Sequence, residues 1–552
     1  CKGMKRLGPY FVKIVIKKNN YIKPDAYILY ICIGGIHFKR KKRFILINAE
    51  ETINQTDGNT LEYKLHPHLG LIYVGTVVQQ EGWEVILHDE VIQGYIDLEK
   101  IIQPGDIVGL SLVVSGLSRG IKLAQQAKEL GATYVIAGND AAIFRTNQIL
   151  TLPKKPIDAI FTSNSLTPIR QFFKSIDKIP IDKLSIDGMQ TQPESKIYSN
   201  QKVILQEELQ QRIQLRKKKL FDAQDIFIIP NLHLPGDDYW QQVWSNYRTL
   251  LGHKHKNPHQ VKNALIKWAQ GCTRTQMTDV CKYCTIAGVA DIRLATYSHL
   301  EQLYTTYQDF GIDYVYNTTD SVFEMKPIIK RLIKIGVYFN EGVMLYGRGW
   351  GLAHQPQLID EWLKITGGRL LVNVGFDSGD ERILSQGIVK ASTKGSRLAE
   401  NKQAIKNIKK HGAHLHYALI FGSPGETQES CKRTLEFFDY TRQELGQQLD
   451  QCETDFFWLN HGSPASEVFT NYAYAQQLAQ LAGKSISPSE WKKDFYQHKD
   501  TLVVPWECEI AWYKYFTNIS IEYAQECIDY VIKKMAEHEG AVPGRPNIFK
   551  SI

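Results

Sequence analysis

The chain has 552 residues, enough for two to four domains, and its hydrophobic content of 43% allows sizeable cores. A net charge of +8 would suggest a nucleic-acid partner, but the excess lies at one end. Residues 1–43 contain twelve Lys and Arg against one Asp, so residues 44–552 carry about −3. Because residues 44–552 are not basic, they are unlike a region that binds a nucleic-acid substrate through its phosphates.

Residues 1–42 form a basic extension to which the sequence gives no role. The apolar stretch at 26–36 is too short to cross a bilayer. Five basic residues follow at 39–43, where a signal peptide would have the small residues of a cleavage site. The nine cysteines show no disulfide-like spacing, which favours a reducing compartment. We therefore expect a cytoplasmic protein without a membrane partner.

Residues 43–175 alternate between short apolar runs and amphipathic stretches. This alternation predicts an α/β domain with a doubly wound, Rossmann-like parallel sheet. Strands are expected at 43–48, 84–88, 106–111, 134–138 and 159–161, and helices at 69–80 and up to residue 130. An open sheet of this kind binds its ligand at the carboxyl ends of its strands.

Residues 176–260 form a mixed connector. The stretch 206–219 is rich in Gln, Glu, Lys and Arg and predicts a solvated helix. Trp240, Trp244 and Tyr247 follow at helical spacing, which indicates a buried helix face rather than a ligand site.

Three cysteines, Cys272, Cys281 and Cys284, follow a strand-like segment at 264–269. A cluster of four irons usually takes four thiolates, so three would leave one iron open to a substrate or cofactor. Zinc and plain buried thiols are the alternatives. A zinc site would need a further ligand, and three histidines lie upstream: His253, His255 and His259.

Two later strands end in turns that suit a bound cofactor. One apolar run, beginning at 371, breaks into the turn 375–379, and the other, beginning at 416, ends in Gly-Ser-Pro-Gly-Glu-Thr at 422–427. Glycine lets the backbone approach a flat ring closely. In an α/β barrel, strand ends of this kind build the ligand site.

These segments together resemble the radical S-adenosylmethionine (SAM) enzymes, in which three cysteines hold a [4Fe–4S] cluster whose open iron binds SAM. The usual spacing is Cys-x3-Cys-x2-Cys, whereas this chain has Cys-x8-Cys-x2-Cys. The longer first loop can still close, because five added residues cost little. Tyr283 keeps the family's aromatic residue before the last cysteine. The resemblance covers roughly 260–440 and implies a partial (β/α)6 TIM-type barrel at 261–444.

The resemblance also implies roles for individual residues. Cys272, Cys281 and Cys284 would be the metal ligands. The SAM-binding residues would be Thr319 and Asp320 for the amino group, Asp377 and Ser378 for the ribose and methionine parts, and Ile420, Gly422 and Glu426 at the adenine. The glycines usual beside the amino group are missing before Asp320.

Tyr346 and Arg348 stand in a turn after another expected strand and are candidate catalytic residues facing the cavity. An ordinary turn with core aromatics accounts for them equally well.

The domain at 43–175 resembles the cobalamin-binding domain that precedes the barrel in one large class of radical SAM enzymes. The matching segments are 65–70, 106–111 and 135–140. The residues implied to line the corrin and its nucleotide tail are Ser111, Ser115, Gly138, Asn139 and Asp140. The motif Asp-x-His-x-x-Gly is absent, as is common in this class, and residues 162–165 replace a Gly-rich turn. A flavodoxin-like interaction domain would give the same pattern.

Residues 445–552 predict a helical, aromatic-rich C-terminal domain that shapes the substrate pocket. Its dispersed cysteines favour buried thiols over an auxiliary cluster.

The resemblance therefore implies a cobalamin-dependent radical SAM enzyme with three cofactors: a [4Fe–4S] cluster, SAM and cobalamin. The expected reaction is C-methylation of a small molecule or peptide, using a 5′-deoxyadenosyl radical and methylcobalamin. A flavodoxin- or ferredoxin-type protein would donate the electron. The alternatives are a rearrangement or cyclisation without methyl transfer, and a cobalamin-binding regulator that has lost its chemistry.

Overall fold

The computed structural model describes residues 42–50, 65–162, 165–192, 227–272, 281–284, 292–386, 388–389 and 397–538, and the backbone of three strands before residue 34. The chain divides into two compact units, 1–43 and 44–552. The first contains an antiparallel sheet in the order β1 (Arg6–Leu7), β2 (Tyr10–Lys18) and β3 (Tyr27–Ile33). Across the described residues, no helix combines the length and apolarity needed to cross a membrane.

The second unit begins with the doubly wound sheet that the sequence predicts. Its strand order is β5 (Glu84–Asp89), β4 (Arg43–Asn48), β6 (Ile107–Ser111), β7 (Tyr134–Gly138), β8 (Ala159–Phe161) and β9 (Met189–Gln190). Strands β4, β6, β7 and β8 run parallel, and β9 pairs antiparallel with β8. The edge strand β9 lies within the stretch that was predicted to be a connector.

Apolar side chains cover both faces of this sheet. Along β4, Phe44 and Leu46 join one buried cluster, while Ile45 and Ile47 join another. This alternation is expected when successive side chains point to opposite faces of a strand. The helices of the domain are α2 (Leu69–Gln80), α3 (Glu90–Gln93), α4 (Leu98–Ile101), α5 (Leu117–Glu129), α6 (Asp140–Phe144), α7 (Thr146–Leu150) and α8 (Thr167–Ser175).

Helix α10 (Asp237–Leu251) follows, and its aromatic stripe is buried as predicted. Trp240 packs edge-on against Phe310, with ring centroids 5.2 Å apart. The Tyr239 hydroxyl donates a 3.0 Å hydrogen bond to Asp89 at the end of β5. The solvated helix predicted at 206–219 lies outside the described residues.

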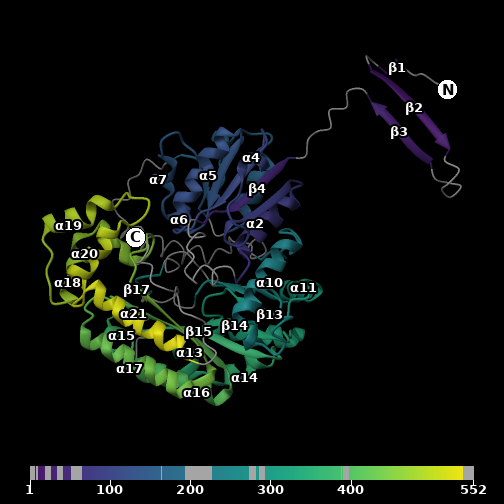
Figure 1. Ribbon diagram of the computed structural model, residues 1–552. Coiled ribbons are helices and arrows are strands. Elements are labelled where there is room, and N and C mark those ends of the chain that lie inside the picture. Colours follow the sequence, from purple (N-terminus) through teal and green to yellow (C-terminus); the bar gives the residue numbers. More distant parts are fainter. Residues whose placement is uncertain are drawn as a thin grey trace. The chain divides into compact units, whose positions relative to one another are not determined.

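Six parallel strands then form the predicted partial barrel, in chain order (Figure 1). They are β10 (Asn263–Ile266), β13 (Tyr314–Asn317), β14 (Gly342–Gly347), β15 (Arg369–Asp377), β16 (His414–Phe421) and β17 (Leu449–Phe456). Helices alternate with the strands: α11 (Tyr297–Asp309), α12 (Lys326–Ile335), α13 (Gly349–His354), α14 (Gln357–Leu363), α15 (Glu381–Ser385), α16 (Arg397–His411) and α17 (Gln428–Leu445). Because β17 lies beyond residue 444, the barrel extends past the boundary predicted there.

The strand predicted at 264–269 is broken. Strand β10 ends at Ile266, and β11 (Ala269–Gln270) pairs antiparallel with β12 (Arg293–Leu294) instead. Trp268 lies at the break, where its buried ring stacks on Trp362 at 5.8 Å. Burial of this large side chain outside the barrel strand redirects the chain into the cysteine segment.

The C-terminal region after β17 is helical, as predicted. Its helices are α18 (Tyr472–Leu481), α19 (Pro488–Asp494), α20 (Trp506–Phe516) and α21 (Ile521–Ala536). Trp512 of α20 stacks on Phe457 with ring centroids 4.7 Å apart. The dispersed cysteines are buried free thiols: Cys431, Cys452, Cys508 and Cys527.

Candidate functional site

The cysteine segment lies at the carboxyl edge of the barrel. Cys272 follows β11, and its Sγ lies 3.6 Å from the Ser321 hydroxyl, in the turn after β13. Cys281 and Cys284 share a tight turn, in which the Cys284 N–H donates to the Cys281 carbonyl at 3.3 Å. Among the described residues no three His, Cys, Asp or Glu side chains are close enough to hold a metal. Cys272 thus contacts the turn after β13, and the Cys281–Cys284 turn contacts the end of β15 through Tyr283. Residues 273–280 lie outside the description.

One of the three histidines considered for a zinc site, His255, lies away from the cysteines. His255 packs beside Glu341, 3.7 Å from its carboxylate, just before the first residue of β14. That is the amino-terminal edge of the barrel, opposite the cysteines. His255 is therefore not placed to complete a zinc site with them.

A direct hydrogen bond joins the cysteine segment to the turn after β15. The Tyr283 hydroxyl, between Cys281 and Cys284, lies 3.1 Å and 3.2 Å from the two carboxylate oxygens of Asp377. Burial raises the pKa of Tyr283 well above its usual value, and Asp377 and the two thiols add to the shift. Tyr283 therefore stays protonated and donates. Asp377 has a left-handed backbone with φ of 65° at a register shift between β15 and β16, which turns it out of the strand.

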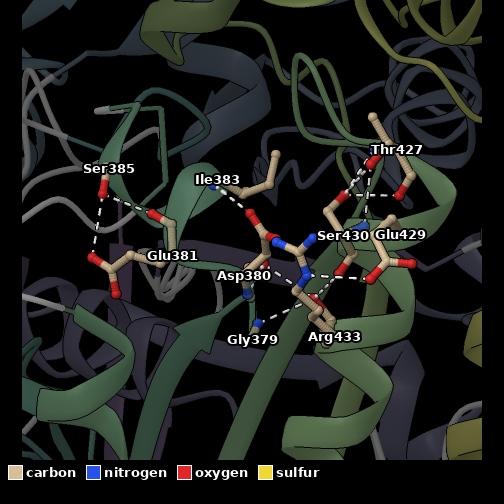
Figure 2. A network of polar contacts seen from close by, with 11 residues as sticks. Gly379, Asp380, Glu381, Ile383, Ser385, Thr427, Glu429, Ser430 and Arg433 are labelled. Carbon is tan, nitrogen blue, oxygen red and sulfur yellow. Dashed lines mark hydrogen bonds and ion pairs between the residues drawn. The ribbon is translucent and has the colours of Figure 1, made fainter.

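The rest of this turn is braced by α17, as Figure 2 shows. The buried Ser378 hydroxyl accepts from the Asp380 N–H at 3.1 Å, and Asp380 caps α15 through the Ile383 N–H at 3.0 Å. Arg433 of α17 binds the other Asp380 oxygen at 2.9 Å. Ser378 thus shapes the turn, and the buried Asp377 carboxylate faces Tyr283 of the cysteine segment.

The turn after β16 is held from within by Glu426. Its buried carboxyl accepts the N–H groups of Gly422 and Ser423. Burial raises its pKa to about 8, although these N–H groups oppose the shift. Glu426 is therefore largely protonated at neutral pH and supports the turn.

Gly422 is required in this turn by its backbone and by its neighbour. Its φ is 96°, and a Cβ there would lie 2.1 Å from the Tyr513 hydroxyl. Helix α20 covers the turn, with Trp512 donating to the Gly422 carbonyl at 2.8 Å and Tyr513 to the Phe421 carbonyl at 3.0 Å.

A cavity of about 220 Å³ connects these parts along β16 and β17. Ile420, the predicted adenine contact, lines it together with Tyr283 of the cysteine segment. The carboxylates of Glu453 and Asp455 line its β17 side, with Trp458 beyond them. Sequence reasoning missed these residues, although acidic side chains two apart mark one face of a strand.

Thr319 and Asp320 follow β13, as predicted, but with different surroundings. The Thr319 hydroxyl donates to the Ala269 carbonyl at 2.6 Å and accepts from the Ala269 N–H at 3.1 Å. It therefore fixes β11 ahead of Cys272. Asp320 lies within electrostatic range of Lys267; burial lowers the pKa of Lys267 and Asp320 opposes that effect.

Tyr346 and Arg348 are separated by the end of β14. The Tyr346 hydroxyl contacts that of Tyr316 inside the barrel. The Arg348 backbone N–H donates to Glu324 at 2.8 Å, and its guanidinium lies 3.6 Å from the same carboxylate. Arg348 thus braces the next turn.

The residues predicted to line the corrin gather at the carboxyl edge of the N-terminal sheet. Asn139 donates to the Ser111 hydroxyl at 3.0 Å and caps α6 by accepting from the Asp140 N–H at 2.8 Å. Ser115 donates to Glu50 at 3.1 Å. Gly138 ends β7, and a Cβ there would meet nothing nearer than 3.8 Å.

His68 belongs to the same edge and was not predicted as a site residue. Its Nε2 lies 3.3 Å from the Ser111 hydroxyl, and its Nδ1 accepts from the Leu71 N–H at 3.3 Å. Histidine is not among the residues that usually cap helices, and its contact with β6 depends on the tertiary fold, so no local signal marked it.

Of the comparisons with known proteins, the one with solved structures finds similar proteins. No protein-family model matches the chain, and neither does any curated protein. Among solved structures, the radical S-adenosylmethionine methyltransferase TsrM from Kitasatospora setae, with cobalamin and a [4Fe–4S] cluster bound, matches with a TM-score of 0.61. The match covers 92% of this chain and 93% of that one at 13% identity. The chain has the fold of TsrM.

A second TsrM structure, with tryptophan substrate and the SAM analogue aza-SAM bound, matches at a TM-score of 0.54 and 13% identity. This match covers 81% of this chain and 78% of that one. The predicted α/β fold class is therefore confirmed.

Proposed function

We propose that this chain is a cobalamin-dependent radical SAM enzyme that transfers a methyl group to carbon. The observation that carries the proposal is the hydrogen bond from Tyr283 to Asp377. It joins the three-cysteine segment to the turn after β15, at the edge where barrel enzymes keep their active sites. The cavity at Ile420 begins at the same tyrosine.

Cys272, Cys281 and Cys284 would hold the cluster. Thiolates are the ligands that iron–sulfur clusters take, and three leave one iron free for SAM. The fit rests on their common edge of the barrel and on Thr319, which fixes the strand before Cys272. When bound, the cluster and SAM supply one-electron chemistry, and cobalamin supplies a methyl group carried on cobalt.

The turns after β15 and β16 would bind SAM. Asp377 offers a carboxylate to ribose hydroxyls or the ammonium, while Ser378 and Arg433 keep its turn in place. Gly422 brings backbone close to the adenine, beside Ile420. Glu426 holds that turn from behind, and Asp320 offers a second carboxylate to the ammonium.

Cobalamin would lie over the carboxyl edge of β6 and β7. Ser111, Ser115 and Asn139 present polar groups there, and the open surface at Gly138 permits close approach. Both ring nitrogens of His68 are already hydrogen-bonded within the protein. His68 therefore supports this edge rather than ligating cobalt.

The reaction and the substrate class draw support from the structural relatives. Both TsrM structures are of a methyltransferase, and one of them contains tryptophan as substrate. We infer that this chain acts on a small molecule or a peptide and takes electrons from a flavodoxin- or ferredoxin-type protein. The non-basic body of the chain argues against nucleic acid as the substrate.

The test is anaerobic reconstitution of the full chain with iron, sulfide and hydroxocobalamin, followed by incubation with methyl-labelled SAM. We expect about four irons and one corrinoid per chain, with label appearing on the corrinoid. Zinc in place of iron, or iron without corrinoid, would contradict the proposal. Both cofactors without movement of the label would favour a rearrangement or cyclisation instead.

A further inference from the structure

Lys267 is a cation at the carboxyl edge of the barrel that the proposed cofactor sites do not use. It is half-buried and follows Ile266, the last residue of β10, a few residues before Cys272. Burial lowers the pKa of Lys267, and the Asp320 carboxylate opposes that effect. An amine placed in this way invites the question of which anion it serves.

The neighbours of Lys267 along the chain show which way its side chain points. Ile266 and Trp268 are both buried in the core, and the Trp268 ring stacks on Trp362 of α14, on the helix side of the sheet. The Thr318 N–H donates to the Ile266 carbonyl at 2.9 Å, which extends the parallel pairing to this point. Because successive side chains of a strand point to opposite faces, Lys267 points into the barrel.

The position of Lys267 is beside the first cysteine. Strands β10 and β13 pair in parallel up to the last residue of each, so the residues that follow them lie side by side. Asp320 and Ser321 follow β13, and the Ser321 hydroxyl lies 3.6 Å from Cys272 Sγ. Lys267 is therefore at the place proposed for the amino-acid end of SAM.

The residues proposed to bind SAM leave its carboxylate without a partner of opposite charge. The methionine part of SAM carries one ammonium and one carboxylate. Asp320 and Asp377 are suited to the ammonium, and the thiolates of the cluster ligands add negative charge nearby. A carboxylate that is partly removed from water costs free energy unless a cation or hydrogen-bond donors compensate it.

Two other cations at the carboxyl edge already have carboxylate partners. Arg348 lies 3.6 Å from Glu324, and Arg433 binds Asp380 at 2.9 Å. For Lys267, the described residues provide only the longer-range attraction of the acid after β13. A lysine ammonium has three N–H donors, so Lys267 can bind a ligand without giving up a contact within the described part of the chain.

We propose that Lys267 binds the carboxylate of the methionine part of SAM. This inference deepens the proposed function and rests on it. The Lys267 ammonium would donate to the carboxylate, and Asp320 would help to keep the amine charged when no ligand is bound. The barrel edge at β10 and β13 would then distinguish SAM from molecules that share its adenosine and sulfonium but lack the carboxylate.

The experiment compares SAM with decarboxylated SAM, which keeps the adenosine, the sulfonium and the amine. Each is measured by equilibrium dialysis with the reconstituted holoenzyme, without reductant, so that SAM is not cleaved. Lys267→Met should weaken SAM binding by about tenfold or more, the scale of one charge-assisted hydrogen bond, and should not weaken the binding of decarboxylated SAM. A general defect in folding or in cluster content would weaken both ligands, so the comparison separates the two causes.

Two further variants complete the test. Lys267→Arg keeps the positive charge and should retain most of the SAM affinity. The matched control, Lys330→Met on the exposed side of α12, should bind both ligands like the wild type. Equal losses for the two ligands in Lys267→Met, or an unchanged SAM affinity, would overturn the inference. Failure of the proposed function would show separately, as wild-type protein without iron or corrinoid.

Discussion

The two edges of the barrel handle buried charge in opposite ways. At the amino-terminal edge, Asp450 lies 2.6 Å from Lys254 and 2.5 Å from Arg369. Burial alone would raise the pKa of Asp450, but the two cations hold it well below its usual range. At the carboxyl edge, burial raises the pKa of Glu426 to about 8. Charges are thus paired within the protein at the amino-terminal edge, whereas at the carboxyl edge a buried acid without an ion-pair partner among the described residues is held protonated in a turn proposed to bind SAM.

Removing the anion at the amino-terminal edge should have the largest effect. Asp450→Ala leaves two buried cations without their partner, so we expect a loss of about 3–5 kcal/mol in the free energy of unfolding, measured with urea. The control is Glu444→Ala, which breaks an exposed pair with Lys409 and should cost under about 1 kcal/mol. Equal losses in the two variants would show that the amino-terminal network is not stabilising.

The pH dependence of the free energy of unfolding should reveal the buried carboxyl of Glu426 at the carboxyl edge of the barrel. The folded-state pKa of Glu426 is about 8, against an ordinary value of 4.5, so the folded protein holds a proton that the unfolded chain loses. Stability should therefore fall as the pH rises from about 5 to 8, by about 2–4 kcal/mol in all. Glu426→Gln should remove only the Glu426 share of this fall, because burial also raises the pKa of Glu509 to about 8 and that of Glu324 to about 7, and Glu436→Gln should follow the wild type. A wild-type slope of zero would contradict the raised pKa.

Gly422→Ala tests the close packing of α20 on the turn after β16. The added Cβ would meet the Tyr513 hydroxyl at a left-handed backbone position, so we expect about 2–3 kcal/mol of destabilisation and weaker SAM binding. Gly483→Ala has a similar φ of 66° with nothing within 4 Å, and should cost only about 1 kcal/mol. The clash involves the Tyr513 ring carbon Cζ at 2.5 Å as well as the hydroxyl, so Gly422→Ala should cost less in a Tyr513→Ala background, and an unchanged cost would mean that the contact is not the cause.

Tyr283→Phe should have the smallest effect on stability, about 1 kcal/mol, because it removes one hydrogen bond to Asp377. SAM affinity, measured by equilibrium dialysis on the reconstituted protein, should still fall, because this bond positions the Asp377 turn. Tyr304→Phe removes an exposed bond to the Tyr338 carbonyl and should leave SAM affinity unchanged. If Tyr283→Phe bound SAM as tightly as the wild type, the hydrogen bond between Tyr283 and Asp377 would not contribute to SAM binding.

The N-terminal sheet was predictable because its strands are short apolar runs between helical stretches. Helix α2 begins and ends where the apolar periodicity does, at Leu69 and Gln80. Strand β17 was not predictable in the same way, because its apolar residues, Leu449, Cys452 and Phe456, form neither a continuous run nor a strict alternation with polar ones. It is polar because its inner face lines the barrel beside the cavity.

Individual site residues were predictable only where they belong to a recognisable sequence motif. The turn at Gly422 was placed correctly at a strand end, but the sequence does not reveal that Tyr513, about ninety residues later, packs on it. Thr319 was expected to face a ligand, whereas its hydroxyl binds Ala269. Such pairings depend on which loops the fold brings together, and the local periodicity of the sequence does not predict them.

The most direct test of the central claim is electron paramagnetic resonance of the reduced, reconstituted protein before and after addition of SAM. If three cysteines hold a [4Fe–4S] cluster with one open iron, the reduced protein gives a cluster signal that changes on adding SAM. Cys281→Ala should lose the signal, and Cys508→Ala, a buried thiol in α20, should keep it. A reduced protein without a cluster signal, or a signal that SAM leaves unchanged, would contradict the account.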